Sequence, residues 1–182
     1  MDRSHVAVIV TFIVSALLIV SVAMPWAYYE KGQVHIRYSA TEARVCILGR
    51  HCTDVQWKDI HSIKSRLRDI AEIAYGVTSD DAVVRNETVY PEIGHVKLPS
   101  KPVDIVYLIV PASIPFSATS MPIRWKAARC SLVAFSALLI FISVVISLAQ
   151  ISHFSQRIGA GAGVAIASMI VACMRAVAEV FI

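Results

Sequence analysis

The sequence predicts an all-α transmembrane bundle of three spans with a small α+β extracellular domain in the loop between the first and second spans. Three observations predict this fold class. The chain is 57% hydrophobic and 16% charged, which is more apolar than an ordinary soluble domain at roughly 45–50%. Of its 17 basic and 13 acidic residues, all but five lie between residues 30 and 129. Three apolar runs before and after that region are long enough to cross a bilayer.

The first apolar run, residues 5–24, contains no ionisable side chain after His5. At ~1.5 Å per residue its twenty residues cover the ~30 Å of a hydrocarbon core, which predicts a transmembrane helix. A cleaved signal peptide is the alternative, because Arg3 precedes the run and small residues lie at 21–23. The apolar stretch exceeds the roughly 7–15 residues of a signal core, so we favour an anchor. Pro25 ends the helix, and an interfacial aromatic belt is expected at Trp26, Tyr28 and Tyr29.

The second and third spans are predicted at residues 129–150 and 158–182. The third opens with alternating Gly and Ala, and Gly159, Gly163 and Ala167 recur every four residues. A second series with the same spacing is Ser168, Ala172 and Ala176. Small residues at this spacing let helices approach closely in lipid, so we expect a packing seam on this span, against a membrane partner or a second copy.

Two charged residues interrupt the third span. Arg175 and Glu179 lie one helical turn apart, so they share a face and are expected to form an intramembrane ion pair. The alternative is that both lie at the interface, where the arginine side chain reaches the headgroups. The pair is a functional hypothesis in the first case only.

Residues 25–128 form the predicted loop domain, and two features place it outside the cytoplasm. Cys46 and Cys52 bound a segment of seven residues that a disulfide would close in an oxidising compartment. Asn86, followed by Glu87 and Thr88, is a glycosylation acceptor. Both signals predict a loop that is extracellular or lumenal.

The charge pattern opposes this sidedness in part, because Arg124, Lys126 and Arg129 flank the second span on the predicted outer side. The conflict disappears if residues 103–123 also cross the membrane, which would give four spans. Three prolines interrupt that segment at 111, 115 and 122. We therefore favour a buried strand that ends at Pro111.

Within the loop, apolar residues at steps of three and four predict an amphipathic helix over residues 54–75. Strands are predicted at residues 33–38, 44–48, 82–90 and 103–110. The loop is thus expected to fold as a small sheet with one helix.

The residues that could support catalysis form no recognisable motif. His51 and His61 lie near the two loop cysteines, but the spacing is not that of a zinc site, and no nucleophile motif or phosphate loop is present. We predict no enzyme activity, no metal and no cofactor. The fourteen basic and eleven acidic residues of the loop region are interleaved, so nucleic-acid binding is not expected.

Three short stretches resemble the claudin-like superfamily: a first span that ends near Trp26, the segment from Cys46 to Cys52 around Leu48 and Gly49, and the step from Lys126 to Arg129 through two alanines. Among its members the chain most resembles the amastins. The segment from Cys46 to Cys52 is similar to a shortened form of the amastin signature. The aromatic and hydroxyl residues of that signature are absent, and in a reading of three spans the fourth is missing. The resemblance implies a surface glycoprotein with four spans and the large loop first.

The predicted function is that of a non-enzymatic multi-pass glycoprotein of the plasma membrane, with an adhesion, interaction or membrane-organising role. Its expected partners are the lipid bilayer and membrane proteins or further copies of itself. The alternative is an accessory subunit of a larger membrane complex, in which Arg175 and Glu179 require a partner.

Overall fold

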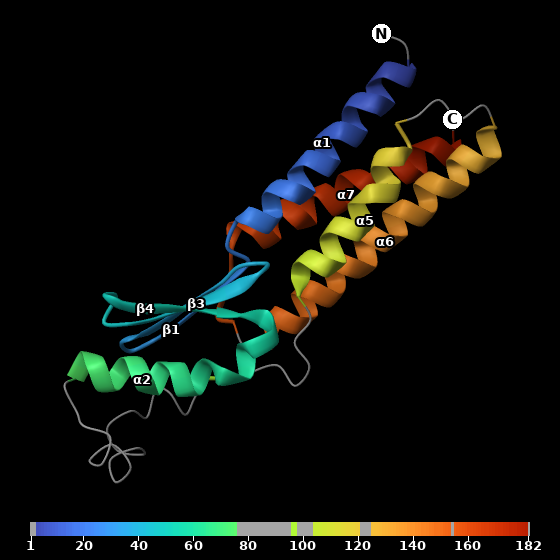
Figure 1. Ribbon diagram of the computed structural model, residues 1–182. Coiled ribbons are helices and arrows are strands. Elements are labelled where there is room, and N and C mark those ends of the chain that lie inside the picture. Colours follow the sequence, from blue (N-terminus) through green and yellow to red (C-terminus); the bar gives the residue numbers. More distant parts are fainter. Residues whose placement is uncertain (1–2, 76–95, 98–103, 121–124, 154, 182) are drawn as a thin grey trace.

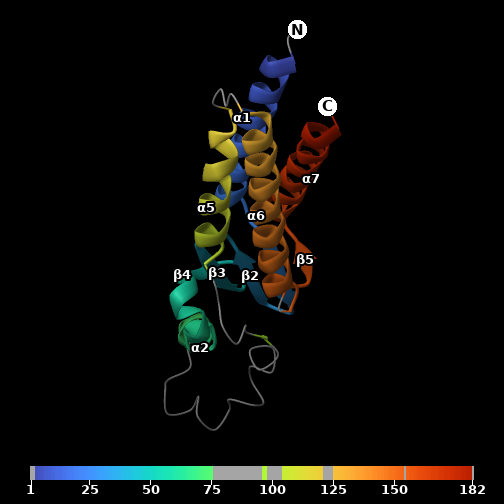
Figure 2. The same cartoon turned by 90° about the vertical axis from the view of Figure 1, so that its right-hand side faces the viewer.

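A computed structural model describes residues 3–75, 96–97, 104–120, 125–153 and 155–181. Four helices lie side by side in a bundle, and a small sheet with one further helix covers one end of it (Figure 1). Both chain termini lie at the opposite end (Figure 2).

The four bundle helices are α1 (Arg3–Ala23), α5 (Ile105–Ala118), α6 (Lys126–Ser152) and α7 (Ala160–Phe181). They alternate in direction, and α1 packs against α5 and α7 while α6 packs against the same two helices. Helices α1, α6 and α7 are long and apolar enough to cross a membrane. The three predicted spans are therefore confirmed as helices of that length and composition.

Helix α5 corrects the prediction of a buried strand at residues 103–110. The Asp104 side chain accepts a hydrogen bond from the Val106 backbone N–H at 3.0 Å and caps the helix. Pro111 and Pro115 lie inside it, and the Ser113 hydroxyl donates to a backbone oxygen of the preceding turn. The segment packs against α1 and α6, and this tertiary packing keeps a β-branched run with prolines helical although the two prolines contribute no backbone N–H. Its fourteen residues cover about 21 Å.

The sheet contains β1 (Ala27–Lys31), β2 (Val34–Tyr38), β3 (Glu42–Ile47), β4 (His51–Gln56) and β5 (Arg157–Ile158). Its spatial order is β4-β3-β2-β1-β5, and all paired strands are antiparallel. The first four strands follow α1, whereas β5 comes from the connection between α6 and α7. Two connections at the same end of the bundle thus build one sheet.

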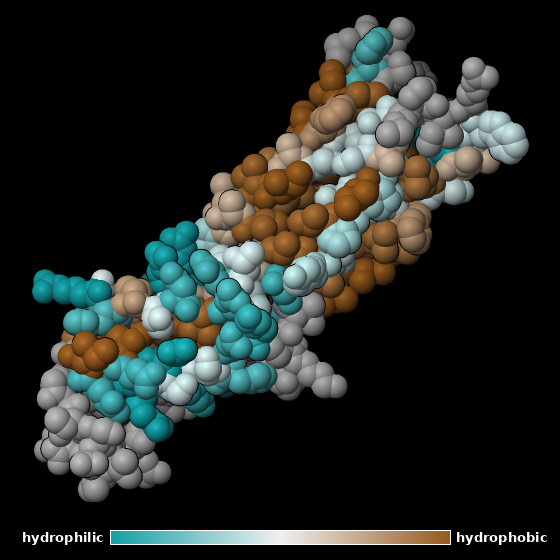
Figure 3. Space-filling view, viewed as in Figure 1, coloured by the Kyte–Doolittle hydropathy of each residue, from teal (hydrophilic) through white to brown (hydrophobic). Residues whose placement is uncertain are grey.

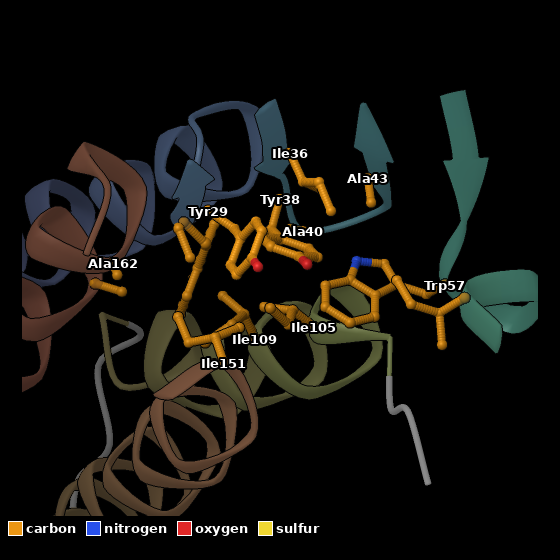
Figure 4. Packing of buried hydrophobic residues seen from close by; sticks show 14 of the residues in the cluster. Tyr29, Ile36, Tyr38, Ala40, Ala43, Trp57, Ile105, Ile109, Ile151 and Ala162 are labelled. Atoms are coloured by element: carbon orange, nitrogen blue, oxygen red, sulfur yellow. The ribbon is translucent and has the colours of Figure 1, made fainter. Parts of the chain in front are cut away.

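One face of the sheet is buried. Strand residues alternate between buried and exposed, for example Val34, Ile36 and Tyr38 inward along β2. A 3-10 turn, η1 (Trp57–Ser62), and helix α2 (Ile63–Tyr75) pack on this side. Figure 4 shows that these side chains meet the ends of the bundle helices, so the sheet and the bundle share one core. The labelled residues of that contact are Tyr29, Ile36, Tyr38, Ala40, Ala43, Trp57, Ile105, Ile109, Ile151 and Ala162.

Several loop predictions need correction. Strands are present at both 33–38 and 44–48, within one or two residues of the predicted bounds, but the helix predicted from residue 54 begins later, because β4 extends to Gln56. The strand predicted at 82–90 lies outside the described residues. The aromatic belt is wrong at Trp26 and Tyr29, which are buried in the core.

Candidate functional site

The open face of the sheet carries a row of polar side chains that crosses all five strands. The register aligns Arg157, Tyr28, Arg37, Arg44 and Asp54 as successive neighbours. Residues directly opposite each other in a ladder point to the same face. This row therefore gathers three arginines on the side that α2 does not cover.

Arg44 and Asp54 neutralise each other within this row. Arg44 Nε donates to Asp54 Oδ1 at 2.8 Å and Arg44 Nη2 donates to Oδ2 at 3.0 Å, the bidentate geometry that arginine favours with carboxylates. These bonds hold the pKa of Asp54 below its usual range and raise that of Arg44. Arg37 forms no salt bridge with any residue that the structure describes.

A pocket of about 220 Å³ lies where the open face meets the last turn of α1. Val22 and Ala23 of α1 form its apolar side. Arg37, Glu42 and Arg44 contribute its charged groups. It is the place where the apolar bundle and the charged face meet.

The disulfide lies at the other end of the same face. Cys46 and Cys52 are direct cross-strand neighbours in β3 and β4 and form a disulfide. The turn between them places Leu48 and Gly49 at positive φ, 56° and 67°. The predicted pairing is therefore present, and it closes the hairpin tip farthest from the bundle.

Arg175 and Glu179, predicted as an ion pair within α7, form no salt bridge with each other among the described residues. Glu179 pairs with Arg129 of α6, which the sequence separates from it by 50 residues. Arg175 is only 7% exposed, and none of its guanidinium nitrogens has a hydrogen-bond partner among the described residues. Its guanidinium carbon lies 5.3 Å from the ring centroid of Phe116 in α5, within the range of a cation–π contact.

The small residues of α7 fall on two faces. A Cβ at Gly159 would lie 2.3 Å from the Pro25 backbone oxygen, so this glycine allows α7 to begin directly against the end of α1. Gly163 has no atom within 4 Å of such a Cβ, and Ala167 is exposed. Ser168 and Ala172 of the second series are buried within the chain. A packing role of Gly163 and Ala167 against another chain stays a prediction.

The remaining predicted residues form no cluster. The described residues include no group of three His, Cys, Asp or Glu that could hold a metal ion. His51 lies on β4 beside the disulfide and His61 in η1. Asn86 lies outside the described residues.

Sequence reasoning missed the pocket and its charged row. The signal was available in part, because His35 and Arg37 alternate with Val34, Ile36 and Tyr38, which is the pattern of a strand with one polar face. The strand that carries Asp54 was read as helix, so its pairing with Arg44 was not expected.

No protein-family model and no curated protein matches the chain.

Proposed function

We propose that this chain is a non-enzymatic multi-pass membrane protein of the cell surface, whose four bundle helices all cross the bilayer and whose sheet makes contacts outside the cell. The observation that carries the proposal is that the α1–α5 connection and the α6–α7 connection form a single sheet at one end of the bundle, and that this sheet contains a disulfide. Disulfides form and persist in oxidising compartments. Figure 3 agrees with this arrangement, with hydrophobic side chains along the helices and hydrophilic ones over the sheet and α2.

The proposal includes α5 as a fourth crossing. Its fourteen residues cover less than the hydrocarbon core, and a short span is accommodated by local thinning of the bilayer. The helix packs against α1 and α6, with apolar side chains such as Ile114 exposed. Because α5 runs away from the sheet, the start of α6, with Lys126 and Arg129, lies at the end of the bundle opposite the sheet. The short basic connection then lies in the cytoplasm, as the positive-inside rule expects. The charge conflict noted for three spans is removed.

We further propose membership of the claudin-like superfamily, with amastins as the most similar branch. The support is the order of parts: four helices, the large loop after the first, Trp26 at the end of α1 and a close cysteine pair in the loop. Adhesion, interaction or membrane organisation is the role that follows, through the open face of the sheet.

Glycosidase treatment tests the sidedness. We expect a mobility shift of the chain expressed in a eukaryotic cell, and none for Asn86→Gln. Extraction at alkaline pH tests insertion, since the chain is expected to stay with the membrane pellet. Release without detergent, or glycosylation at an asparagine engineered between α5 and α6, would contradict the proposal.

An accessory subunit of a larger membrane complex is the second candidate. Buried Arg175 favours it, because an unpaired charge in a bundle is expensive and an acidic group on a partner would stabilise it. Purification in mild detergent separates the two: a stoichiometric partner that is lost with Arg175→Met favours the subunit, and a chain isolated alone favours the surface protein.

A further inference from the structure

The pocket at the end of α1 is lined by Arg37, which forms no salt bridge with a described residue, by the anion Glu42 and by Arg44. Asp54 engages Arg44 with both carboxylate oxygens, which leaves Arg37 and Glu42 as the charged groups available to a ligand. Glu42 lies two residues before Arg44 in β3, and Arg37 lies directly opposite Arg44 in β2. The two side chains therefore share the open face. A ligand that carries one negative and one positive group matches this pair.

An apolar track leads from the pocket along α1. Ile19 precedes Val22 by three residues and Ala23 by four, so the three side chains share one face of the helix. Ile19 is 60% exposed, and the same stripe continues through Ala16 to Phe12, both exposed. A polar pocket above an apolar stripe has the form that a lipid with a charged headgroup requires.

We propose that this pocket binds the headgroup of a zwitterionic phospholipid of the leaflet next to the sheet. Arg37 binds the phosphate, whose oxygens suit the paired N–H donors of a guanidinium. Glu42 faces the ammonium group, and the acyl chains follow the stripe on α1. An anionic lipid offers the phosphate alone and leaves Glu42 without a cation. The inference rests on the proposed function, because it needs α1 in a bilayer.

Native mass spectrometry of the full chain, delipidated in detergent, tests the proposal. The probes are phosphatidylcholine and phosphatidylglycerol with identical acyl chains, offered together. We expect wild type to retain phosphatidylcholine, Arg37→Gln to lower that retention by about tenfold, and Arg37→Lys to restore part of it. Glu42→Gln should remove the preference between the two lipids. Lys31→Gln is the matched control, since Lys31 is exposed at the other end of the β1–β2 hairpin.

The remaining outcomes overturn the proposal. Equal retention of both lipids by wild type removes the headgroup selectivity, and unchanged retention by Arg37→Gln removes the phosphate contact. Soluble glycerophosphocholine, added at the same concentration, should not displace the lipid; equal competition would mean that the stripe contributes nothing. A chain that stays in the membrane at alkaline pH but shows no selectivity contradicts only this inference, whereas release at alkaline pH contradicts the proposed function.

Discussion

Gly159 lies against Pro25 so closely that a Cβ on the glycine would stand 2.3 Å from the proline backbone oxygen. The contact joins the start of α7 to the end of α1, and two backbone hydrogen bonds reinforce it, from Gly159 N–H to the Trp26 oxygen at 2.7 Å and from Gly161 N–H to the Pro25 oxygen at 2.8 Å. Trp26, completely buried, adds an indole N–H bond to the Ser21 oxygen at 2.9 Å. The junction therefore holds the sheet to the bundle at the point where α1 becomes β1.

Gly159→Ala should destabilise the chain. The atoms in the way belong to the backbone, so they cannot turn aside, and overpacking of this kind costs about 1–3 kcal/mol. Denaturant unfolding in detergent micelles measures the effect. Gly163→Ala is the matched control, because its Cβ meets nothing within 4 Å and alanine is the better helix former. Equal stability of the two variants would contradict the close contact.

The cross-strand disulfide should contribute to stability. Closing a loop of about seven residues contributes about 2 kcal/mol in the chain-entropy account, so Cys46→Ser with Cys52→Ser is expected to lower the unfolding free energy by that amount. Cys173→Ala is the control, since Cys173 is a free cysteine of α7. A loss of the same size in the control, or no change on reduction of wild type, would speak against the disulfide.

The charges at the far end of the bundle allow a double-mutant test. Glutamine at Arg129, at Glu179 and at both should give a coupling energy of about 1 kcal/mol or more, because the pair is mostly removed from water. The same cycle on Arg175 and Glu179 should give a smaller coupling energy. A larger coupling energy for Arg175 and Glu179 than for Arg129 and Glu179 would support the ion pair that helical spacing predicts.

Arg175→Met should stabilise the chain or leave it unchanged. Its guanidinium is buried without a hydrogen-bond partner among the described residues, and a hydrophobic side chain of similar length removes the desolvation cost at the loss of one contact with Phe116. Thermal unfolding in micelles measures the change. A clear drop in the midpoint would show that Arg175 has an ionic partner in the folded protein.

The Arg44–Asp54 pair predicts a pH dependence. The pKa of Asp54 is lower in the folded chain than its usual value, so its contribution to stability is complete above about pH 5. That contribution is lost as the pH falls through the folded pKa. The difference in melting temperature between wild type and Asp54→Asn should therefore be constant near neutrality and shrink below about pH 4. A difference that persists in acid would assign the effect to something other than the carboxylate.

Sequence alone predicted the features that depend on neighbours in the chain. Residues 5–24, 129–150 and 158–182 are apolar over the length of a span, and this one-dimensional property survives in α1, α6 and α7. The cysteine pair was likewise predictable, because Cys46 and Cys52 are only six positions apart in the sequence. For these features, the composition and spacing of residues along the chain were sufficient for the prediction.

The features that were missed depend on contacts between distant segments. Helix α5 has the β-branched content of a strand, and its helical state depends on packing between α1 and α6. The spacing of Arg175 and Glu179 describes one helix only and cannot reveal Arg129 on the next. Strand β5 consists of two residues whose role appears only beside β1. Each of these is set by tertiary structure, which overrides local propensity.

The most direct test of the account is the labelling of two single cysteines from outside intact cells. With Cys130 and Cys173 replaced by alanine and the disulfide retained, Lys31→Cys reports on the sheet and Lys126→Cys on the start of α6; both lysines are exposed. A membrane-impermeant maleimide should label Lys31→Cys on intact cells and Lys126→Cys only after permeabilisation, because in the proposed topology α5 crosses the bilayer between them. Labelling of both positions on intact cells would contradict the four-helix crossing.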